Sequence, residues 1–139
     1  MPDTIKFIIP GEPVAKGRAR SFVRNGRIAH YTPAKTARYE SLVRLVAQQA
    51  MSEKLPVEGA VNLTIRAFLT IPTSWSLKKQ QAAAIGAIAH TKRPDLDNIV
   101  KAIKDGANGV TWEDDSQVID VRASKQYGTP RVEVEITIC

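Results

Sequence analysis

The hydrophobic and polar positions along the chain predict strands near its start, in its middle and at its end. Residues 4–9, TIKFII, alternate weakly and are rich in β-branched side chains, and a Pro-Gly pair follows them. Residues 60–72 give the clearest strand, because large apolar side chains alternate there with smaller ones. Residues 117–128 and 131–138 predict two antiparallel strands joined around Gly128-Thr129-Pro130.

A β-hairpin is predicted within the basic segment that follows the first strand. Asn25-Gly26, in the stretch RNGR, is the strongest short signal for a tight hairpin turn. Arg20, Val23 and Ile28 then lie in the arms of the hairpin or beside it.

Three helices are predicted from spacing and capping residues. The first follows Thr32 as N-cap, with Pro33 at the first helical position. The second covers the alanine-rich residues 74–90 and starts at a serine cap, and the third runs from Asp95 to about Asn108, where two glycines close it. The order strand, hairpin, helix, strand, helix, helix, strand, strand predicts one α+β domain over residues 1–139, with a mixed β-sheet packed against about three helices.

The composition is that of a soluble globular protein. The chain has 139 residues, of which 43% are hydrophobic and 24% charged. The apolar run near the start is too short for a signal peptide, and no segment reaches the length of a membrane-spanning helix. The one cysteine, Cys139, has no second cysteine with which to form an internal disulfide. We therefore expect a cytoplasmic protein without a membrane partner.

The positive charge is concentrated in one part of the chain. The formal net charge is +6 and the sequence pI is about 9.7. Residues 13–39 contain no acid, which suits a phosphate backbone, because neutralised phosphates release condensed counterions. The alternative is a solvated surface that only keeps the protein soluble. The basic residues of this segment are Lys16, Arg18, Arg20, Arg24, Arg27, Lys35 and Arg38.

The acids, in contrast, form two tight clusters, RPDLDN at 93–98 and WEDDSQ at 112–117. With Asp95 as the N-cap of the third helix, Asp97, Lys101 and Asp105 form one stripe on the side opposite the apolar residues. An aspartate at a helix start is also explained by capping alone, and Asp105 is explained by an exposed ion pair with Lys101. The capping explanation does not extend to the second cluster.

The short connection after the helix is expected to bring Asp114 or Asp115 back towards the first cluster. Two carboxylates 4 Å apart repel by about 4 kcal/mol at an effective dielectric near 20, so converging acids need a cation or a raised pKa. Hard oxygen ligands suit Mg²⁺ or Mn²⁺. Zinc is disfavoured by the lack of Cys and His ligand spacing, and the EF-hand loop pattern is absent. A cation beside a basic tract predicts a metal-dependent nuclease, with Lys101 placed to stabilise charge on phosphorus.

The stretch RPDLDNIVKAIKDGANGV with TWEDDSQV resembles the signature of the RusA family of Holliday-junction resolvases, densely over residues 93–118. The resemblance implies that Asp95, Asp97 and Asp115 bind the metal, that Lys101 is needed for cleavage, and that Asp114 matters less. It further implies a small homodimer, often prophage-borne, that uses Mg²⁺ to nick four-way junctions symmetrically in recombination and repair and leaves 5′-phosphates.

Two other functions stay open at this stage. One is a non-catalytic basic protein that binds nucleic acid, and the other is a nuclease for other branched DNA such as forks or flaps. DNA contacts are expected from charge alone at Lys16, Arg18, Arg20, Arg24 and Arg27. Trp112, Trp75 and His90 are interpreted as packing or surface residues rather than as site residues.

Overall fold

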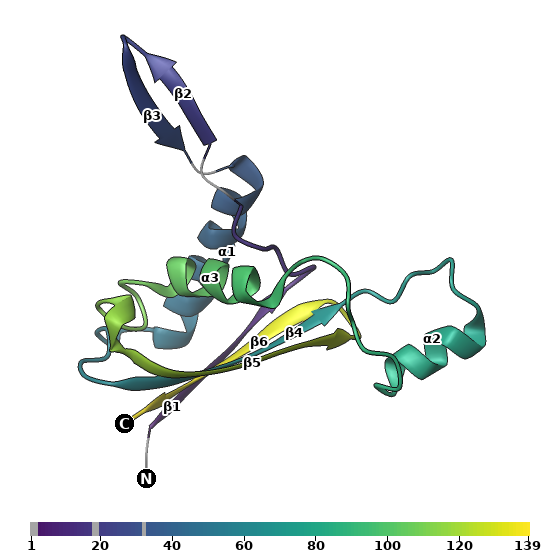
Figure 1. Ribbon diagram of the computed structural model, residues 1–139. Coiled ribbons are helices and arrows are strands. Elements are labelled where there is room, and N and C mark those ends of the chain that lie inside the picture. The colour runs from purple at the N-terminus through teal and green to yellow at the C-terminus, as the bar shows by residue number, and fades with distance from the viewer. Residues whose placement is uncertain (1–2, 18–19, 32) are drawn as a thin grey trace.

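The computed structural model describes residues 3–17, 20–31 and 33–139 and confirms an α+β domain with a mixed sheet and three helices (Figure 1). Among these residues, no helix is both long and apolar enough to cross a membrane. The elements are β1 (Thr4–Pro10), β2 (Arg20–Arg24), β3 (Arg27–Tyr31), α1 (Ala34–Met51), β4 (Val61–Leu69), α2 (Leu77–Ala84), α3 (Leu96–Ala107), the 3₁₀ turn η1 (Asp115–Gln117), β5 (Val118–Tyr127) and β6 (Arg131–Ile138).

The main sheet has the strand order β1-β6-β4-β5. β4 pairs in parallel with β5 and antiparallel with β6, and β6 pairs antiparallel with β1. The last two strands of the chain therefore run in opposite directions, as predicted, but they do not pair with each other because β4 lies between them. The parallel pair requires a long crossover, and α2 with α3 supplies it.

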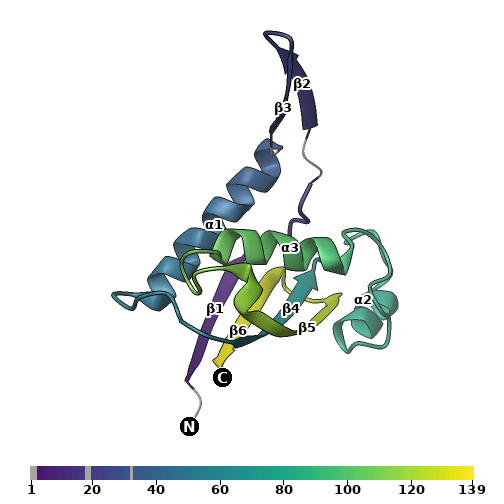
Figure 2. The ribbon, with the colours of Figure 1, turned by 60° about the vertical axis from the view of Figure 1, so that its left-hand side comes forward.

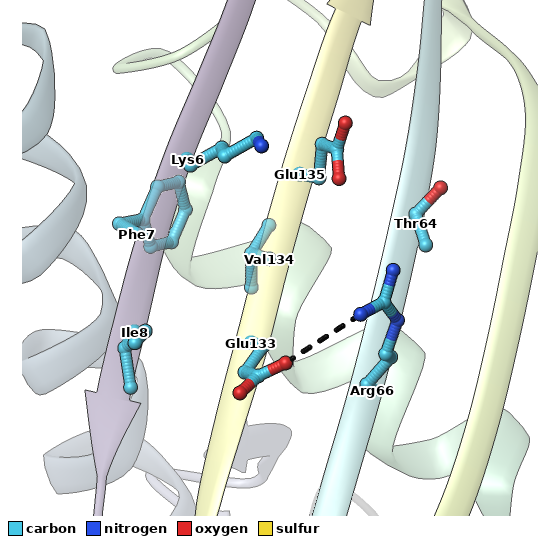
Figure 3. A pocket seen from close by; sticks show the side chains of 8 residues that line it. All are labelled: Lys6, Phe7, Ile8, Thr64, Arg66, Glu133, Val134 and Glu135. Atoms are coloured by element: carbon cyan, nitrogen blue, oxygen red, sulfur yellow. Dashed lines mark ion pairs between the residues drawn. The ribbon is translucent and has the colours of Figure 1, made fainter.

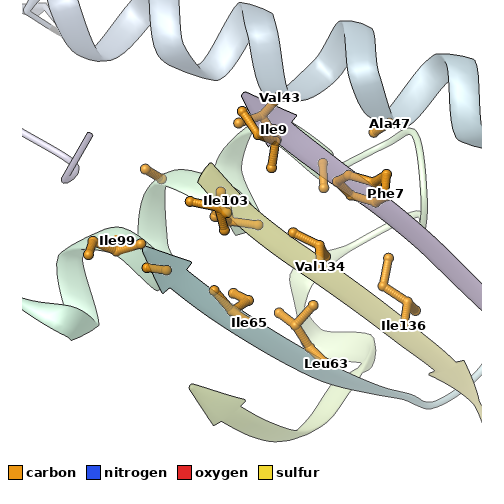
Figure 4. Close-up of a cluster of buried hydrophobic side chains, with 14 of the residues drawn as sticks. Phe7, Ile9, Val43, Ala47, Leu63, Ile65, Ile99, Ile103, Val134 and Ile136 are labelled. Atoms are coloured by element: carbon orange, nitrogen blue, oxygen red, sulfur yellow. The ribbon is translucent and has the colours of Figure 1, made fainter. Parts of the chain in front are cut away.

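Helices α1 and α3 pack together over one face of the sheet (Figure 2). Alternate residues of β1, β4 and β6 point into this layer, which gives their strict in-and-out burial (Figure 4). Trp112 is 0% exposed, which confirms its interpretation as a core residue. The buried cluster includes Ile9, Val43, Leu63, Ile65, Ile99, Ile103, Val134 and Ile136.

Among the described elements, no helix covers the other face of the sheet, and this face is hollowed (Figure 1). A depression of about 530 Å³ lies over β1, β6 and β4, and the residues that line it are Lys6, Phe7, Ile8, Thr64, Arg66, Glu133, Val134 and Glu135 (Figure 3). Arg66 and Glu133 face each other across it, with 3.7 Å between the guanidinium Nη1 and the carboxylate Oε1 (Figure 3). The hollow contains none of the residues that the sequence assigns to a site.

The predicted hairpin is confirmed as β2 and β3, and it projects away from the rest of the chain (Figures 1 and 2). Asn25 and Gly26 both have positive φ angles, 53° and 75°, as a two-residue hairpin turn of the favoured twist requires. The first helix begins at Ala34, with Pro33 at the N-cap position, so Pro33 is not its first helical residue as predicted. Thr32, the predicted cap, lies outside the described residues.

The second helix is shorter than predicted at both ends, whereas the third agrees with its predicted bounds. The second helix covers Leu77–Ala84 rather than 74–90, because Ser76 caps it and the positive φ of Gly86 (81°) ends it early. The third helix covers Leu96–Ala107, between Asp95 and Asn108 as caps, but Gly106 is buried inside it and does not close it as predicted. A Cβ on Gly106 would lie 2.6 Å from Cβ of Val43 and 3.0 Å from the backbone oxygen of Glu40, so glycine is needed there for the contact with α1.

Candidate functional site

The first acid cluster lies at the amino end of α3. Asp95 is at the N-cap position, and its backbone carbonyl accepts a hydrogen bond from Ile99 N at 3.1 Å. Its carboxylate makes no capping hydrogen bond, so the cap interpretation does not account for this side chain. Asp95 and Asp97 are both exposed, and neither forms an ion pair within residues 3–17, 20–31 and 33–139. Two carboxylates are therefore available to an external cation.

The backbone that leads into α3 is held by the neighbouring strand. Lys125 of β5 donates hydrogen bonds from Nζ to the carbonyl oxygen of Lys92 at 2.6 Å and to that of Pro94 at 3.0 Å. The Arg93–Pro94 peptide bond between these carbonyls is cis. Lys125 thus fixes the residues just before Asp95, a role for which the sequence offers no signal, because its partners are backbone atoms 31 and 33 residues away.

A groove of about 940 Å³ opens beside Asp95. Its walls are the segment 13–17, the start of α1 and the residues that enter α3, and both Lys35 and Arg93 line it. Lys16 N donates to the Asn98 carbonyl at 2.9 Å, which places the beginning of the acid-free segment against the first turn of α3. Positive side chains and the exposed carboxylate therefore share one groove, as binding of a phosphate chain beside a cation requires.

One turn further along α3, two lysines and two acids form a chain of ion pairs. Nζ of Lys101 lies 2.8 Å from Oδ1 of Asp105, and Nζ of Lys16 lies 3.2 Å from Oδ2 of Asp105 and 2.6 Å from Oε1 of Glu40. Lys16 thus connects α3 to α1, a contact between distant segments that the sequence does not indicate. Its predicted contact with DNA stays a prediction.

These ion pairs shift the pKa values of two members. Burial alone would raise the pKa of Asp105, but the hydrogen bonds and charges of Lys101 and Lys16 outweigh it and hold that pKa below its usual value of 3.8. Burial likewise would lower the pKa of Lys16, yet Glu40 and Asp105 hold it above 10.5. The expected ion pair between Lys101 and Asp105 is confirmed, and Asp105 is more enclosed than an exposed stripe implies.

In the second acid cluster the neighbouring aspartates have different partners. Asp114 caps η1: its carboxylate accepts from the hydroxyl of Ser116 and from Ser116 N, at 3.0 Å in the latter case, and these bonds lower its pKa. Gln117 completes a capping box by accepting from Asp114 N at 2.8 Å. Asp115 is half-buried, and its Oδ1 accepts a hydrogen bond from the indole Nε1 of Trp112 at 2.9 Å. Asp114 therefore shapes the turn, whereas Oδ2 of Asp115 makes no hydrogen bond or ion pair with the described residues.

The two clusters lie towards opposite ends of α3, so the described structure does not show the expected return of Asp114 or Asp115 towards Asp95 and Asp97. Asp95 and Asp97 are at its start, Asp115 follows its end, and a 12-residue helix is about 18 Å long. In the part of the chain that the structure describes, no group of three or more His, Cys, Asp and Glu side chains is arranged to hold a metal ion. The donor chemistry suits a hard divalent cation, but one ion shared by all three aspartates stays a prediction.

Three of the four arginines expected to contact DNA lie on the hairpin. Arg24 and Arg27 face each other across its turn, and both are exposed. Arg20 opens β2, and Arg18 lies outside the described residues. Like charges directly opposite on a hairpin are unfavourable by themselves, so an anionic partner would relieve a repulsion already present.

Comparison with known proteins agrees with these features. A family model described as "Endodeoxyribonuclease RusA" matches residues 10–137. The "Uncharacterized protein YqaN" of Bacillus subtilis (strain 168) is 42% identical over 137 residues, and the match covers 96% of each chain. Both matches include the hairpin, the groove and the two acid clusters.

Proposed function

The chain belongs to the RusA family of endodeoxyribonucleases, and from this membership we propose that it resolves Holliday junctions by Mg²⁺-dependent hydrolysis of phosphodiester bonds. The observation that carries the proposal is the amino end of α3. There, exposed aspartates without basic partners in the described structure stand next to a groove lined by Lys35 and Arg93. A protein that only bound DNA would gain nothing from these acids, because they repel phosphates.

The proposed metal ligands are Asp95, Asp97 and Asp115, with Mn²⁺ as a substitute for Mg²⁺; to share one ion with Asp95 and Asp97, Asp115 would have to move from the other end of α3. A bound divalent cation would lower the pKa of the attacking water and neutralise charge on the phosphate. Trp112 orients Asp115 through the indole hydrogen bond, and Lys125 fixes the backbone before Asp95. Lys101, one helical turn after Asp97, places a positive charge where negative charge builds on phosphorus, and Asp105 holds its ammonium in position.

DNA binding is assigned to the basic segment that begins at the groove. Arg20, Arg24 and Arg27 extend it along the hairpin, Lys16 anchors its start against α3, and Arg18 is proposed as a further contact from its charge alone. A homodimer would present two such sites, as symmetric nicking of two strands requires. The products would carry 5′-phosphates that ligase can seal, which suits a role in recombination and repair in the cytoplasm.

The direct test uses an end-labelled four-way junction with and without Mg²⁺. We expect cutting only with Mg²⁺ or Mn²⁺, and we expect Asp97→Asn to lower the cutting rate more than about 100-fold while junction binding is kept or tightened, since repulsion of phosphates is relieved. Asp120→Asn is the matched control: it removes the same charge from exposed β5 and should change neither property.

Two results would contradict the proposal. Binding that persists without any metal-dependent cutting would favour the non-catalytic DNA-binding protein. Faster cutting of forks or flaps than of the junction, at matched salt, would support a metal-dependent nuclease but show that its substrate is a fork or a flap rather than a four-way junction.

A further inference from the structure

The residues between β4 and α3, which we call the α2 lobe (residues 70–94), form a second acid-free basic segment. No aspartate or glutamate occurs between Glu58 and Asp95. The basic residues of the lobe are all exposed, and none forms an ion pair with another residue of the described chain. These residues are Lys78, Lys79, Lys92 and Arg93. The lobe therefore carries positive charge that the protein itself leaves uncompensated.

Two of these cations gather around one aromatic ring. Nζ of Lys79 lies 4.0 Å from the centroid of the Trp75 ring, and Nζ of Lys92 lies 5.9 Å from it. A ring attracts a cation but does not neutralise it. Bringing like charges together without an acid costs free energy in the unbound protein, and an anion placed between them recovers it.

The lobe is fastened to the sheet. The Trp75 ring packs against Tyr127 of β5 at 5.2 Å between centroids, and the ring of His90 packs on the same tyrosine at 4.8 Å. Lys125, also in β5, holds the end of the lobe through the carbonyls of Lys92 and Pro94. The Trp75 ring and the backbone of Lys92 are thus positioned before any ligand binds, which lowers the entropy cost of binding at Lys79 and Lys92.

The lobe and the β2–β3 hairpin project in different directions. In both ribbon views the amino end of α3 lies between them (Figures 1 and 2). Two separate basic projections on either side of one candidate site suit a ligand whose negatively charged parts diverge. A single straight duplex arm does not have this shape, whereas branched DNA does.

We propose that the α2 lobe binds the phosphate backbone of one arm of a branched DNA, a different arm from the one that the hairpin contacts. This inference rests on the proposed function and names a second contact surface for the same substrate. The residues that carry it are Lys78 and Lys79 on α2, with Lys92 and Arg93 beside the site.

The test compares two double variants with the same loss of charge, both in the Asp97→Asn background so that DNA stays uncut. Lys78→Ala/Lys79→Ala alters the lobe. Lys6→Ala/Lys54→Ala is the control and removes two exposed lysines, one from β1 and one from the loop after α1. This loop lies on the opposite side of the molecule from α2 (Figure 2). Affinities for a four-way junction and for a duplex of the same sequence are measured over a range of salt concentrations.

We expect the lobe variant to bind the junction about 10-fold more weakly. The slope of log affinity against log salt concentration should decrease by the equivalent of about two phosphate contacts. Its affinity for the duplex should fall less than about threefold, because a duplex can still bind through the hairpin. The control variant should match the parent protein on both DNAs. Equal losses for the two variants, equal losses on junction and duplex, or no loss at all would each overturn the inference.

Trp75 gives a second measurement. The chain has two tryptophans, and Trp112 is fully buried, so acrylamide quenching of fluorescence reports mainly on Trp75. Junction binding should protect Trp75, and unchanged quenching at saturating junction would also overturn the inference. Cutting by the unmutated protein is assayed in parallel. Normal Mg²⁺-dependent cutting with an unprotected lobe refutes this inference alone, whereas failure to bind or cut any branched DNA refutes the proposed function with it.

Discussion

The indole Nε1 of Trp112 donates a 2.9 Å hydrogen bond to Oδ1 of Asp115. The ring is buried in the core, while the carboxylate is half-buried at the surface. The bond therefore links the packing of the core to the orientation of a proposed metal ligand. Trp112 has two roles, of which hydrophobic patterning revealed only the first.

Trp112→Phe should separate these roles, since phenylalanine keeps most of the ring but lacks the donor. We expect the Mg²⁺ concentration for half-maximal junction cutting to rise about 10-fold, as occurs when an orienting partner of a metal ligand is lost. Ile65→Val is the control for lost packing, with a cost of about 1 kcal/mol in the free energy of unfolding and no change in the Mg²⁺ midpoint. An unchanged Mg²⁺ midpoint in Trp112→Phe would show that Asp115 is not a metal ligand, or that its orientation does not depend on this hydrogen bond.

Gly106→Ala should destabilise the protein by about 1–3 kcal/mol, because the added methyl group would overlap Val43 where α1 crosses α3. Chemical denaturation gives this value directly. Val43→Ala in the same chain should recover part of the loss, since it removes the side chain that collides. Strict additivity of the two changes would show that Gly106 and Val43 do not interact.

Asp105→Asn should lower the free energy of unfolding at neutral pH by about 1 kcal/mol, because Lys101 and Lys16 both lose a charged partner. The pKa of Asp105 is depressed in the folded protein, so the contribution is present above 3.8 and is lost as the pH falls through the folded-state pKa. The stabilities of parent and variant should therefore converge in acid. Glu53→Gln, at an exposed position without an ion pair in the described structure, should leave the pH profile unchanged.

Arg24→Ala/Arg27→Ala should weaken junction binding by about 5–10-fold and reduce its salt dependence by about two contacts. Stability should be unaffected or slightly higher, because the two arginines face each other in the hairpin register. Electrophoretic mobility shifts at several salt concentrations and a thermal melt check both statements. A fall in affinity without any change in salt dependence would place these arginines off the phosphate backbone.

Local signals predicted the parts of the fold that depend on neighbours in sequence. Asn25-Gly26 fixed the hairpin turn, and strict alternation located β4. The start of α3 followed from Asp95 and the apolar spacing after it. In each case the residues that decide the structure lie within one or two turns of each other, so a pattern read along the chain contains the necessary information.

The parts that could not be predicted depend on distant partners. Nothing in the last two strands indicates that β4 will come between them, because pairing is decided by the whole sheet. The alanine-rich stretch near Gly86 lacks a strong apolar stripe that would reveal its true end. Lys16 pairs with Glu40 and Asp105, which are 24 and 89 residues away, so the sequence suggested a DNA contact where the structure also shows an ion pair.

β5 connects both acid clusters of the proposed site. The strand starts directly after η1, which contains Asp115, and near its other end Lys125 holds the carbonyls that precede Asp95. An extended strand resists changes in length far more than a loop does. A force on the α2 lobe, such as a DNA arm bound there would exert under our proposal, would therefore pass through β5 to Asp115 as well as to Asp95. The spacing of the proposed metal ligands would change only if the sheet itself were deformed.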